Sequence, residues 1–214
     1  MEVCGTNTDT IVNTLEKLGF VTNKKKSVLI PTQRIVFFGF IIDSVLFRVF
    51  LTEGKVNKIL SLAKALKKQK IVQVRSLASF IGLIINAFHA ILEAPLHYRK
   101  LERNKLKGLG SDMNFDNKVE LSDDSLEELD WWLHNSVSKN GKRIRPEKVT
   151  IVCRTDASLL GWGAVDVNSH SFANARWNFQ ESLRHINYLE LLAVFNGLQS
   201  LYSMKEKVHI QIQS

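Results

Sequence analysis

The stretch RTDASLLGWGA, residues 154–164, decides how the C-terminal part of the chain is interpreted. The β-rich segment VTIVCRT runs straight into Asp156 and a hydroxyl residue, and two glycines that bracket a tryptophan follow. Asp and Ser are good turn formers that often stand where strands end, so Asp156 alone is interpreted more readily as a turn residue than as a catalyst. A second carboxylate is needed to change that interpretation.

The segments that follow alternate between strand and helix patterns. GWGAVDV and SFANARW are predicted strands joined by short turns, INYLELLAVFNGLQSL has helical periodicity, and VHIQIQ alternates strictly between apolar and polar residues. Three antiparallel strands, a helix and a fourth strand predict a sheet with a helix packed on it. We therefore expect residues 149–214 to form one unit of the α+β or α/β class.

Aromatic and β-branched residues upstream indicate a β-hairpin. IVFFGFII and VLFRVFL are separated by Asp43-Ser44, which is typical of two paired strands. Gly39 inside the first strand predicts a bulge, or a point where another backbone approaches closely. Together with a preceding helix that stops near Gly19, this region is expected to span residues 1–51.

From Thr52 to residue 137 the pattern is mainly helical, with a polar and flexible stretch after HYRKLERNKLKGLGSD. A first amphipathic helix is followed by a long apolar helix over residues 73–92 and by an acidic helix that Ser122 or Ser125 can cap. SKNGKRIRPEK, residues 138–148, combines glycine, proline and a cationic run. It is predicted to be a basic linker that marks a domain boundary.

Composition narrows the choice of partner. The 214 residues hold 29 Lys and Arg against 21 Asp and Glu, a net charge of +8, which indicates a polyanion, and we place nucleic acid ahead of an anionic membrane surface. The apolar run at 77–92 is short for a membrane span. Cys4 and Cys153 match no metal-ligand or redox spacing, so we expect reduced thiols in an intracellular protein of the cytoplasm or nucleus, with no membrane partner.

Three cationic clusters are candidates for phosphate contacts: Lys24, Lys25 and Lys26; Lys64, Lys67, Lys68 and Lys70; and Lys142, Arg143 and Arg145. Such clusters bind phosphates with little regard to sequence, and their affinity falls steeply with salt. For any single lysine, plain solvation is the alternative. Phe38 and Trp162 could stack on bases, with core packing as the alternative for each.

Glu190 supplies the second carboxylate. It stands in the predicted first turn of an otherwise apolar helix, where a capping box with Asn187 is the alternative explanation. Two divalent metals can activate water and stabilise the leaving oxygen in phosphodiester hydrolysis, and Mg²⁺ prefers carboxylate oxygens from rigid elements. We therefore hypothesise that Asp156 and Glu190 converge on a common magnesium site.

TDASLLGWGAV followed by HINYLELLAVFNGL resembles the ribonuclease H domain of retroelement polyproteins. The resemblance implies that Asp156 and Glu190 are catalytic metal ligands, in a domain that degrades the RNA strand of a hybrid with two Mg²⁺ ions. It also implies a third aspartate one residue beyond HIQIQS. The domain is therefore expected to be incomplete, to hold Mg²⁺ weakly and to have little or no nuclease activity.

The N-terminal part resembles a reverse transcriptase downstream of its catalytic carboxylates. LEKLGFVTNKKKSVLIPTQRIVFFGFIIDS is similar to the end of the palm with the hairpin that contacts the primer, and Phe38-Gly39 is the matching step. Residues Val74, Arg75, Leu77, Ala78 and Gly82 match a thumb pattern. The order of segments, with ELDWWL and HINYLELLAV, resembles DIRS-type, tyrosine-recombinase retrotransposons. No Tyr-x-Asp-Asp motif precedes the hairpin, so no DNA synthesis is expected.

These resemblances imply an α+β fold with four parts: a palm-end hairpin (1–51), a helical thumb and connection (52–137), the basic linker (138–148) and an incomplete ribonuclease H-like α/β domain (149–214). The implied function is that of a retrotransposon fragment, truncated at both ends, that handles RNA–DNA hybrid and template–primer duplex beside other parts of its polyprotein. The implied nucleic-acid contacts are Lys24, Lys25, Lys26, Phe38, Gly39, Lys64, Lys67, Lys68, Arg75, Lys142, Arg143 and Arg145. Two alternatives stay open: a non-catalytic nucleic-acid-binding protein, and the remnant of a decayed element.

Overall fold

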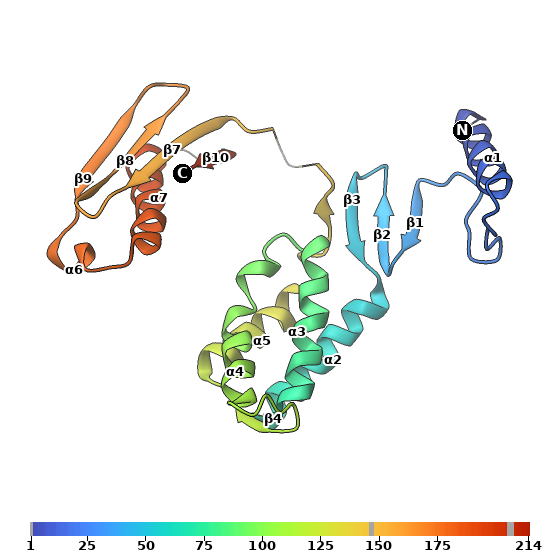
Figure 1. Cartoon of the computed structure of the whole chain (residues 1–214), viewed down its shortest axis with the longest axis horizontal. Coiled ribbons are helices and arrows are strands. Elements are labelled where there is room, and N and C mark those ends of the chain that lie inside the picture. The colour runs from blue at the N-terminus through green and yellow to red at the C-terminus, as the bar shows by residue number, and fades with distance from the viewer. Residues whose placement is uncertain (1, 146–147, 205–207) are drawn as a thin grey trace. The chain divides into compact units, whose positions relative to one another are not determined.

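The computed structural model describes residues 2–145, 148–204 and 208–214 of the chain (Figure 1). The chain divides into two compact units, Met1–Arg145 (unit 1) and Pro146–Ser214 (unit 2), and the division falls inside the predicted linker. Helices and sheets occur in both units. The predicted α+β fold class is confirmed.

Unit 1 begins with helix α1 (Glu2–Lys17), after which Gly19 adopts a left-handed conformation at φ 86°, as is common at helix ends. Three short antiparallel strands follow: β1 (Arg34–Phe37), β2 (Phe40–Asp43) and β3 (Arg48–Leu51). The prediction of one strand over residues 35–42 with a bulge at Gly39 is wrong, because the chain reverses at Phe38-Gly39 and pairs Phe37 with Phe40. Apolar residues on both sides of the turn hide it from a pattern-based prediction.

The remainder of unit 1 is largely helical. Its helices are α2 (Glu53–Gln69), α3 (Val74–Asn86), α4 (Arg99–Leu109) and α5 (Asp123–Asn135), with short 3-10 helices at Ala87–His89 and Ala94–Leu96 and a small sheet of β4 (Ile71–Gln73) and β5 (Lys118–Glu120). The helix predicted over residues 73–92 ends at Asn86. The apolar spacing continues through Phe88 of the first 3-10 helix to Ile91 beyond it, so it does not mark where the α-helix stops.

The helices of unit 1 enclose the main apolar core. Trp132 and Phe80 are the two largest fully buried side chains, and Ile59 and Leu77 are buried with them. The indole of Trp132 donates to the carbonyl of His97 over 2.6 Å, which satisfies its polar edge. Ser122 caps α5 by accepting from the Ser125 amide, as the sequence predicts.

Unit 2 has the predicted order of strands and helix. Strands β7 (Ile151–Ala157), β8 (Gly161–Asp166) and β9 (Phe172–Arg176) are antiparallel, and β10 (Ile210–Gln213) joins β7 in parallel after helix α7 (Ile186–Tyr202). The sheet order is β10-β7-β8-β9. The short helix α6 (Phe179–Ser182) was not predicted from the sequence.

Helix α7 covers one face of this sheet. A Cβ added at Gly197 would lie 2.6 Å from the Ala164 Cβ and 3.4 Å from a methyl of Thr155, so the helix backbone approaches these two neighbouring strands closely. On the opposite face, Phe172 is 71% exposed and Val165 is also open to solvent. Within the described residues, the sheet of unit 2 is therefore covered on one side.

Candidate nucleic-acid interface and acidic pair

The β1–β2 turn presents two aromatic rings to solvent. Phe38 and Gly39 both have positive φ, at 47° and 74°, as in the two-residue hairpin turns that fit the twist of β-strands. Glycine tolerates this conformation, but it is unusual for a bulky residue such as phenylalanine. Phe38 is 82% exposed and Phe37 is 55% exposed, and their ring centroids lie 4.3 Å apart in an edge-to-face arrangement.

Lys55 of α2 holds this turn. Its Nζ donates to the Phe38 carbonyl over 3.2 Å and to Asn86 Oδ1 over 2.6 Å, and it lies 4.0 Å from the centroid of the Phe40 ring. Burial lowers the pKa of this ammonium. Sequence reasoning missed Lys55, because a lysine on an amphipathic helix carries no signal of a partner in a distant turn.

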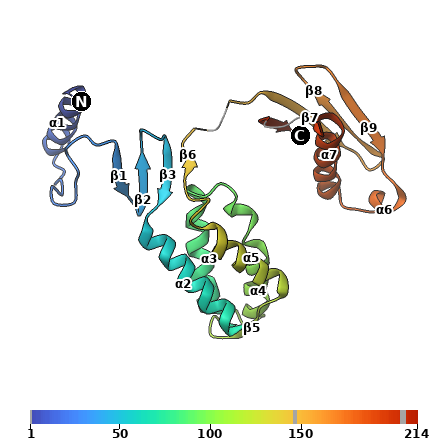
Figure 2. The same ribbon diagram turned by 180° about the vertical axis from the view of Figure 1, so that it is seen from behind.

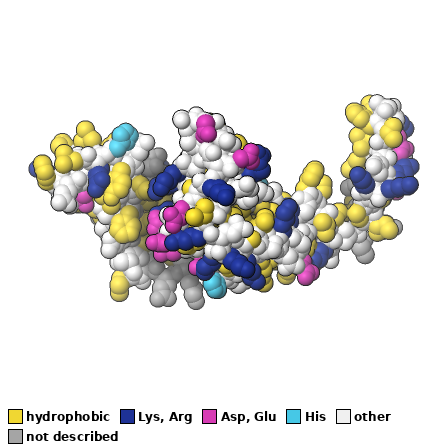
Figure 3. Space-filling view, turned by 90° about the horizontal axis from the view of Figure 1, so that it is seen from below, with side chains coloured by type: hydrophobic (Ala, Val, Ile, Leu, Met, Phe, Trp, Pro, Cys, Tyr) yellow, Lys and Arg dark blue, Asp and Glu magenta, His cyan; other side chains and the backbone are white. Residues whose placement is uncertain are grey.

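The predicted lysines on and around α2 differ in their surroundings. Lys67 pairs with Asp130, and Lys70 lies 3.7 Å from Glu120. Lys64 and Lys68 are exposed and form no ion pair with any residue that the structure describes. Figure 3 shows Lys and Arg side chains interspersed with acidic ones over the helical part of unit 1. The cationic helix is thus partly neutralised by its own chain.

Two further residues that were predicted to contact nucleic acid also form ion pairs within unit 1. Arg75 donates through Nε and an Nη to Asp116, both over 3.0 Å, and Lys24 lies 3.3 Å from Glu16. Lys25 and Lys26 form no ion pair in the described part of the chain. Exposed ion pairs are weak, so Arg75 and Lys24 can exchange their carboxylate partners for a phosphate at little cost in free energy.

Part of the predicted basic linker is fixed to unit 1, and two of its residues form a strand. Strand β6 (Lys142–Arg143) pairs with β3 (Figure 2), and the side chain of Asn140 bonds both backbone groups of Leu51. Lys142 Nζ donates to the Phe88 carbonyl over 3.2 Å, and the Arg145 guanidinium lies 5.1 Å from the Phe47 ring. The linker prediction is wrong for residues 140–144, since these backbone and side-chain contacts fix them to unit 1.

Asp156 projects from the open face of the unit 2 sheet. It pairs with Gly163 of β8, whereas the neighbouring pair of Thr155 and Ala164 lies against α7. Successive residues of a strand point to opposite faces, so Asp156 points away from that helix. Its carboxylate is exposed and accepts no hydrogen bond from the described residues.

Glu190 lies on α7, on the side of the sheet that Asp156 does not face. The helix begins at Ile186, so Glu190 falls in the second turn and not, as predicted, in the first. The N-cap is His185, which accepts from the Asn187 amide over 3.2 Å, and the proposed capping box with Asn187 is wrong. Glu190 is exposed, and the pockets found among the described residues of this unit do not join it to Asp156.

These two carboxylates do not fit a two-metal site by themselves. Two Mg²⁺ ions need several oxygen ligands on a common pocket. Across residues 2–145, 148–204 and 208–214, no group of three or more His, Cys, Asp and Glu side chains could hold a metal ion. The convergence of Asp156 and Glu190 on magnesium therefore stays a prediction, and no catalytic step follows from the geometry.

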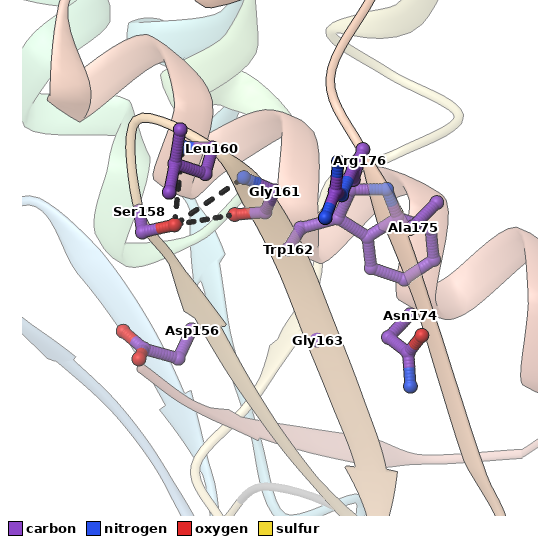
Figure 4. A pocket seen from close by; sticks show the side chains of 9 residues that line it. All are labelled: Asp156, Ser158, Leu160, Gly161, Trp162, Gly163, Asn174, Ala175 and Arg176. Carbon is purple, nitrogen blue, oxygen red and sulfur yellow. Dashed lines mark hydrogen bonds between the residues drawn. The ribbon is translucent and has the colours of Figure 1, made fainter.

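Asp156 instead lines a shallow open pocket on the sheet (Figure 4). The figure shows Asp156 on β7 and Asn174 and Arg176 on β9, with Gly161 and Gly163 of β8 between them. The glycines remove side chains from the floor, so the pocket has a carboxylate on one wall and a guanidinium on the other. Trp162 is half-buried and packs against the two core clusters of unit 2, which favours core packing over base stacking.

No family model matches the sequence, and no curated protein matches it. Among solved structures, the foamy viral protease-reverse transcriptase dRH in complex with ds DNA has 16% identity and a TM-score of 0.49, covering 94% of this chain and 34% of that chain. The foamy viral protease-reverse transcriptase in complex with RNA/DNA hybrid has 15% identity and a TM-score of 0.48, covering 97% and 27%. A complex of the same viral protein with dsDNA has 17% identity and a TM-score of 0.43, covering 88% and 37%.

These likenesses transfer no residue's role to this chain, because the identities and TM-scores are low. The chain spans about a third of the length of these structures. In the part of the chain that the structure describes, no helix is both long and apolar enough to cross a membrane.

Proposed function

We propose that unit 1 binds nucleic acid through its phosphates, with RNA–DNA hybrid or template–primer duplex as the substrate class. The observation that carries the proposal is the uneven distribution of charge between the two units. Residues 1–145 hold 23 Lys and Arg against 15 Asp and Glu, a net charge of +8, whereas residues 146–214 hold six of each. A charge excess confined to one unit is the electrostatic footprint of a polyanion-binding surface.

Among the cations that form no ion pair in the described residues, those of the first basic cluster and of α2 are the best candidates for direct phosphate contact: Lys25, Lys26, Lys58, Lys64 and Lys68. The last three lie on α2, which also carries the Lys55 contact to the hairpin turn. The resemblance to a reverse transcriptase thumb of the DIRS type supports the same helix as the surface that follows the duplex. The proposal includes no catalytic activity of this chain.

Salt dependence tests the proposal. Binding of a labelled RNA–DNA hybrid is measured by fluorescence anisotropy over a range of salt concentrations, for the intact chain and for the double variant Lys64→Gln/Lys68→Gln. We expect the logarithm of the affinity to fall linearly with the logarithm of salt. The slope should decrease by roughly 0.9 for each phosphate that the variant no longer neutralises.

The matched control is Lys107→Gln/Lys118→Gln, which removes two exposed charges from other elements of unit 1. An equal decrease in affinity in both double variants would show that diffuse charge, and not the face of α2, holds the hybrid. Absence of binding at low salt would contradict the proposed function itself.

Hydrolysis of the RNA strand by two metals is proposed only for a polypeptide that adds further carboxylates to Asp156 and Glu190. For this chain we expect no Mg²⁺-dependent cleavage of a labelled hybrid. Cleavage that is lost in Asp156→Asn and retained in Asp166→Asn would contradict this expectation and restore the nuclease hypothesis.

A further inference from the structure

The β1–β2 turn is held in a conformation that its sequence disfavours. A left-handed backbone brings the Cβ of an L-residue close to the following carbonyl oxygen, and Phe38 has no short polar side chain to compensate. Such residues persist where the surrounding structure over-determines them, and they occur often at ligand sites. Phe38 therefore needs a restraint from elsewhere in the fold.

Lys55 supplies the restraint. Its ammonium reaches the carbonyl of the strained residue, the side chain of Asn86 at the end of α3 and the face of the Phe40 ring. A Cβ at Gly39 would lie 2.5 Å from Lys55 Cε, so the lysine stem fills the space under the turn. With two oxygen acceptors and an aromatic face around it, this ammonium is not directed outward as a phosphate contact.

The restraint leaves the two rings at the tip exposed. Phe37 and Phe38 together place two rings in solvent at a hairpin end, where burial in a core cannot explain them. Aromatic side chains in this position serve as platforms for bases, because every base has a π-face. Bases inside a duplex hide those faces, and a blunt duplex offers only its two terminal pairs, so an unpaired base is the ligand that this tip fits best.

We propose that Phe37 and Phe38 form a stacking site for an unpaired base, and that Lys55 is its positioning residue. The proposal rests on the proposed function and deepens it: unit 1 takes nucleic acid with a single-stranded segment beside its duplex. Phosphates are held by the lysines of α2, and the hairpin tip holds a base.

The first experiment separates the ring from the fold. Phe38→Asn creates Asn-Gly, which this type of turn favours, so the hairpin is expected to be retained or stabilised while the ring is removed. The intact chain and the variant are titrated with a single-stranded oligonucleotide and with a blunt duplex that is long enough for its two terminal pairs to be a small fraction of its binding sites. We expect affinity for the single strand to fall about 10-fold and affinity for the duplex to stay within error.

The second experiment tests the role of Lys55 with a double-mutant cycle. Lys55→Met is expected to weaken single-strand binding in the original chain but to add nothing to Phe38→Asn, because an asparagine turn needs no clamp and the Phe38 ring that Lys55 positions is absent. Lys58→Met removes the same charge from the exposed side of α2. It is expected to weaken single-strand and duplex binding equally.

The positioning role would be overturned if the losses of single-strand affinity in Lys55→Met and Phe38→Asn multiplied in the double variant. Independent losses would mean that Lys55 contacts a phosphate and does not act through the ring. Unchanged single-strand affinity in Phe38→Asn would overturn the stacking site and leave the tip as a surface for a protein partner. Failure of the original chain to bind either oligonucleotide would instead contradict the proposed function. Thermal unfolding of each variant confirms that it is folded.

Discussion

Unit 1 and unit 2 differ in both charge and core. Unit 1 carries the whole net charge of +8 and one continuous apolar core around Trp132 and Phe80. Unit 2 is neutral, and its buried apolar residues form two small clusters, around Cys153 and around Trp177. The excess positive charge and most of the buried apolar residues therefore lie in the same unit, whereas unit 2 is a sheet with a helix on one face.

The largest expected effect is a cavity in the core of unit 1. Trp132→Ala removes a fully buried indole and should lower the free energy of unfolding of unit 1 by roughly 3–5 kcal/mol. Hydrogen exchange read by mass spectrometry should show faster exchange in peptides from α2 and α3 and unchanged exchange in peptides from β7 and β8. Equal loss of protection in both units would contradict the contrast between them, because it would mean that they unfold together.

Unit 2 should instead be sensitive to added volume. Gly197→Ala places a methyl 2.6 Å from the Ala164 Cβ, and neither atom can rotate away from the other. Overpacking of this kind costs roughly 1–3 kcal/mol, of which the better helix propensity of alanine offsets at most about 1 kcal/mol. We expect net destabilisation of unit 2, measured as a lower urea midpoint for exchange in β7 and β8.

The same substitution in unit 1 provides the control. Gly82 is an exposed residue of α3 at which an added Cβ meets no atom within 4 Å. Gly82→Ala should therefore stabilise unit 1 by roughly 0.5–1 kcal/mol. Changes in stability of opposite sign for Gly82→Ala and Gly197→Ala would support close helix–sheet packing in unit 2. A gain in stability at both positions would show that the helix propensity of alanine outweighs packing at Gly197.

Helix caps give a smaller effect that also distinguishes the units. Ser122→Ala removes the cap of α5, a helix whose Leu129 and Trp132 are buried, and should cost unit 1 about 1 kcal/mol. Asn178→Ala breaks a complete capping box, but α6 is one turn long and has no buried residue. Urea denaturation of both variants should show destabilisation for Ser122→Ala and a smaller effect for Asn178→Ala.

The sequence predicts those parts of the fold whose signals are local in the chain. Periodicity places α2, and Ser122 marks the start of α5, because both signals are local. The turn at Phe38-Gly39 was missed because its residues look like strand residues, and its conformation depends on a lysine contributed by α2. Strand β6 was missed because its pairing with β3 crosses about 90 residues of the chain.

For the candidate site, too, local properties are predictable from the sequence and contacts between distant residues are not. Net charge and the position of the cationic clusters can be counted in the sequence. Which lysines are neutralised cannot be counted, since Lys67 and Asp130 lie 63 residues apart and Arg75 and Asp116 lie 41 apart. Alternation assigns Asp156 to a face of its strand only once the face that α7 covers is known, and that face is set by packing between distant segments.

The smallest expected effect concerns acid stability. Asp166, buried at the end of β8, accepts from the amides of Ser169 over 3.0 Å and Asn168 over 2.8 Å, and these bonds hold the pKa of its carboxyl below the ordinary value of 3.8. A lowered pKa means that the unfolded chain takes up the proton first as pH falls. The stabilisation is complete above 3.8 and is lost as pH falls through the lower value of the folded state.

Asp166→Asn should therefore flatten the acid dependence of unit 2, because asparagine can still accept from both amides but has no charge to lose. The urea midpoint for exchange in β7 and β8 is compared near neutral pH and below the ordinary carboxyl pKa. Asp43 makes the matching turn in unit 1, where it accepts from the amides of Val45 and Leu46. Asp43→Asn should leave the acid dependence of the urea midpoint of unit 2 unchanged. If that midpoint fell with pH as steeply in Asp166→Asn as in the original chain, its acid dependence would belong to other carboxylates.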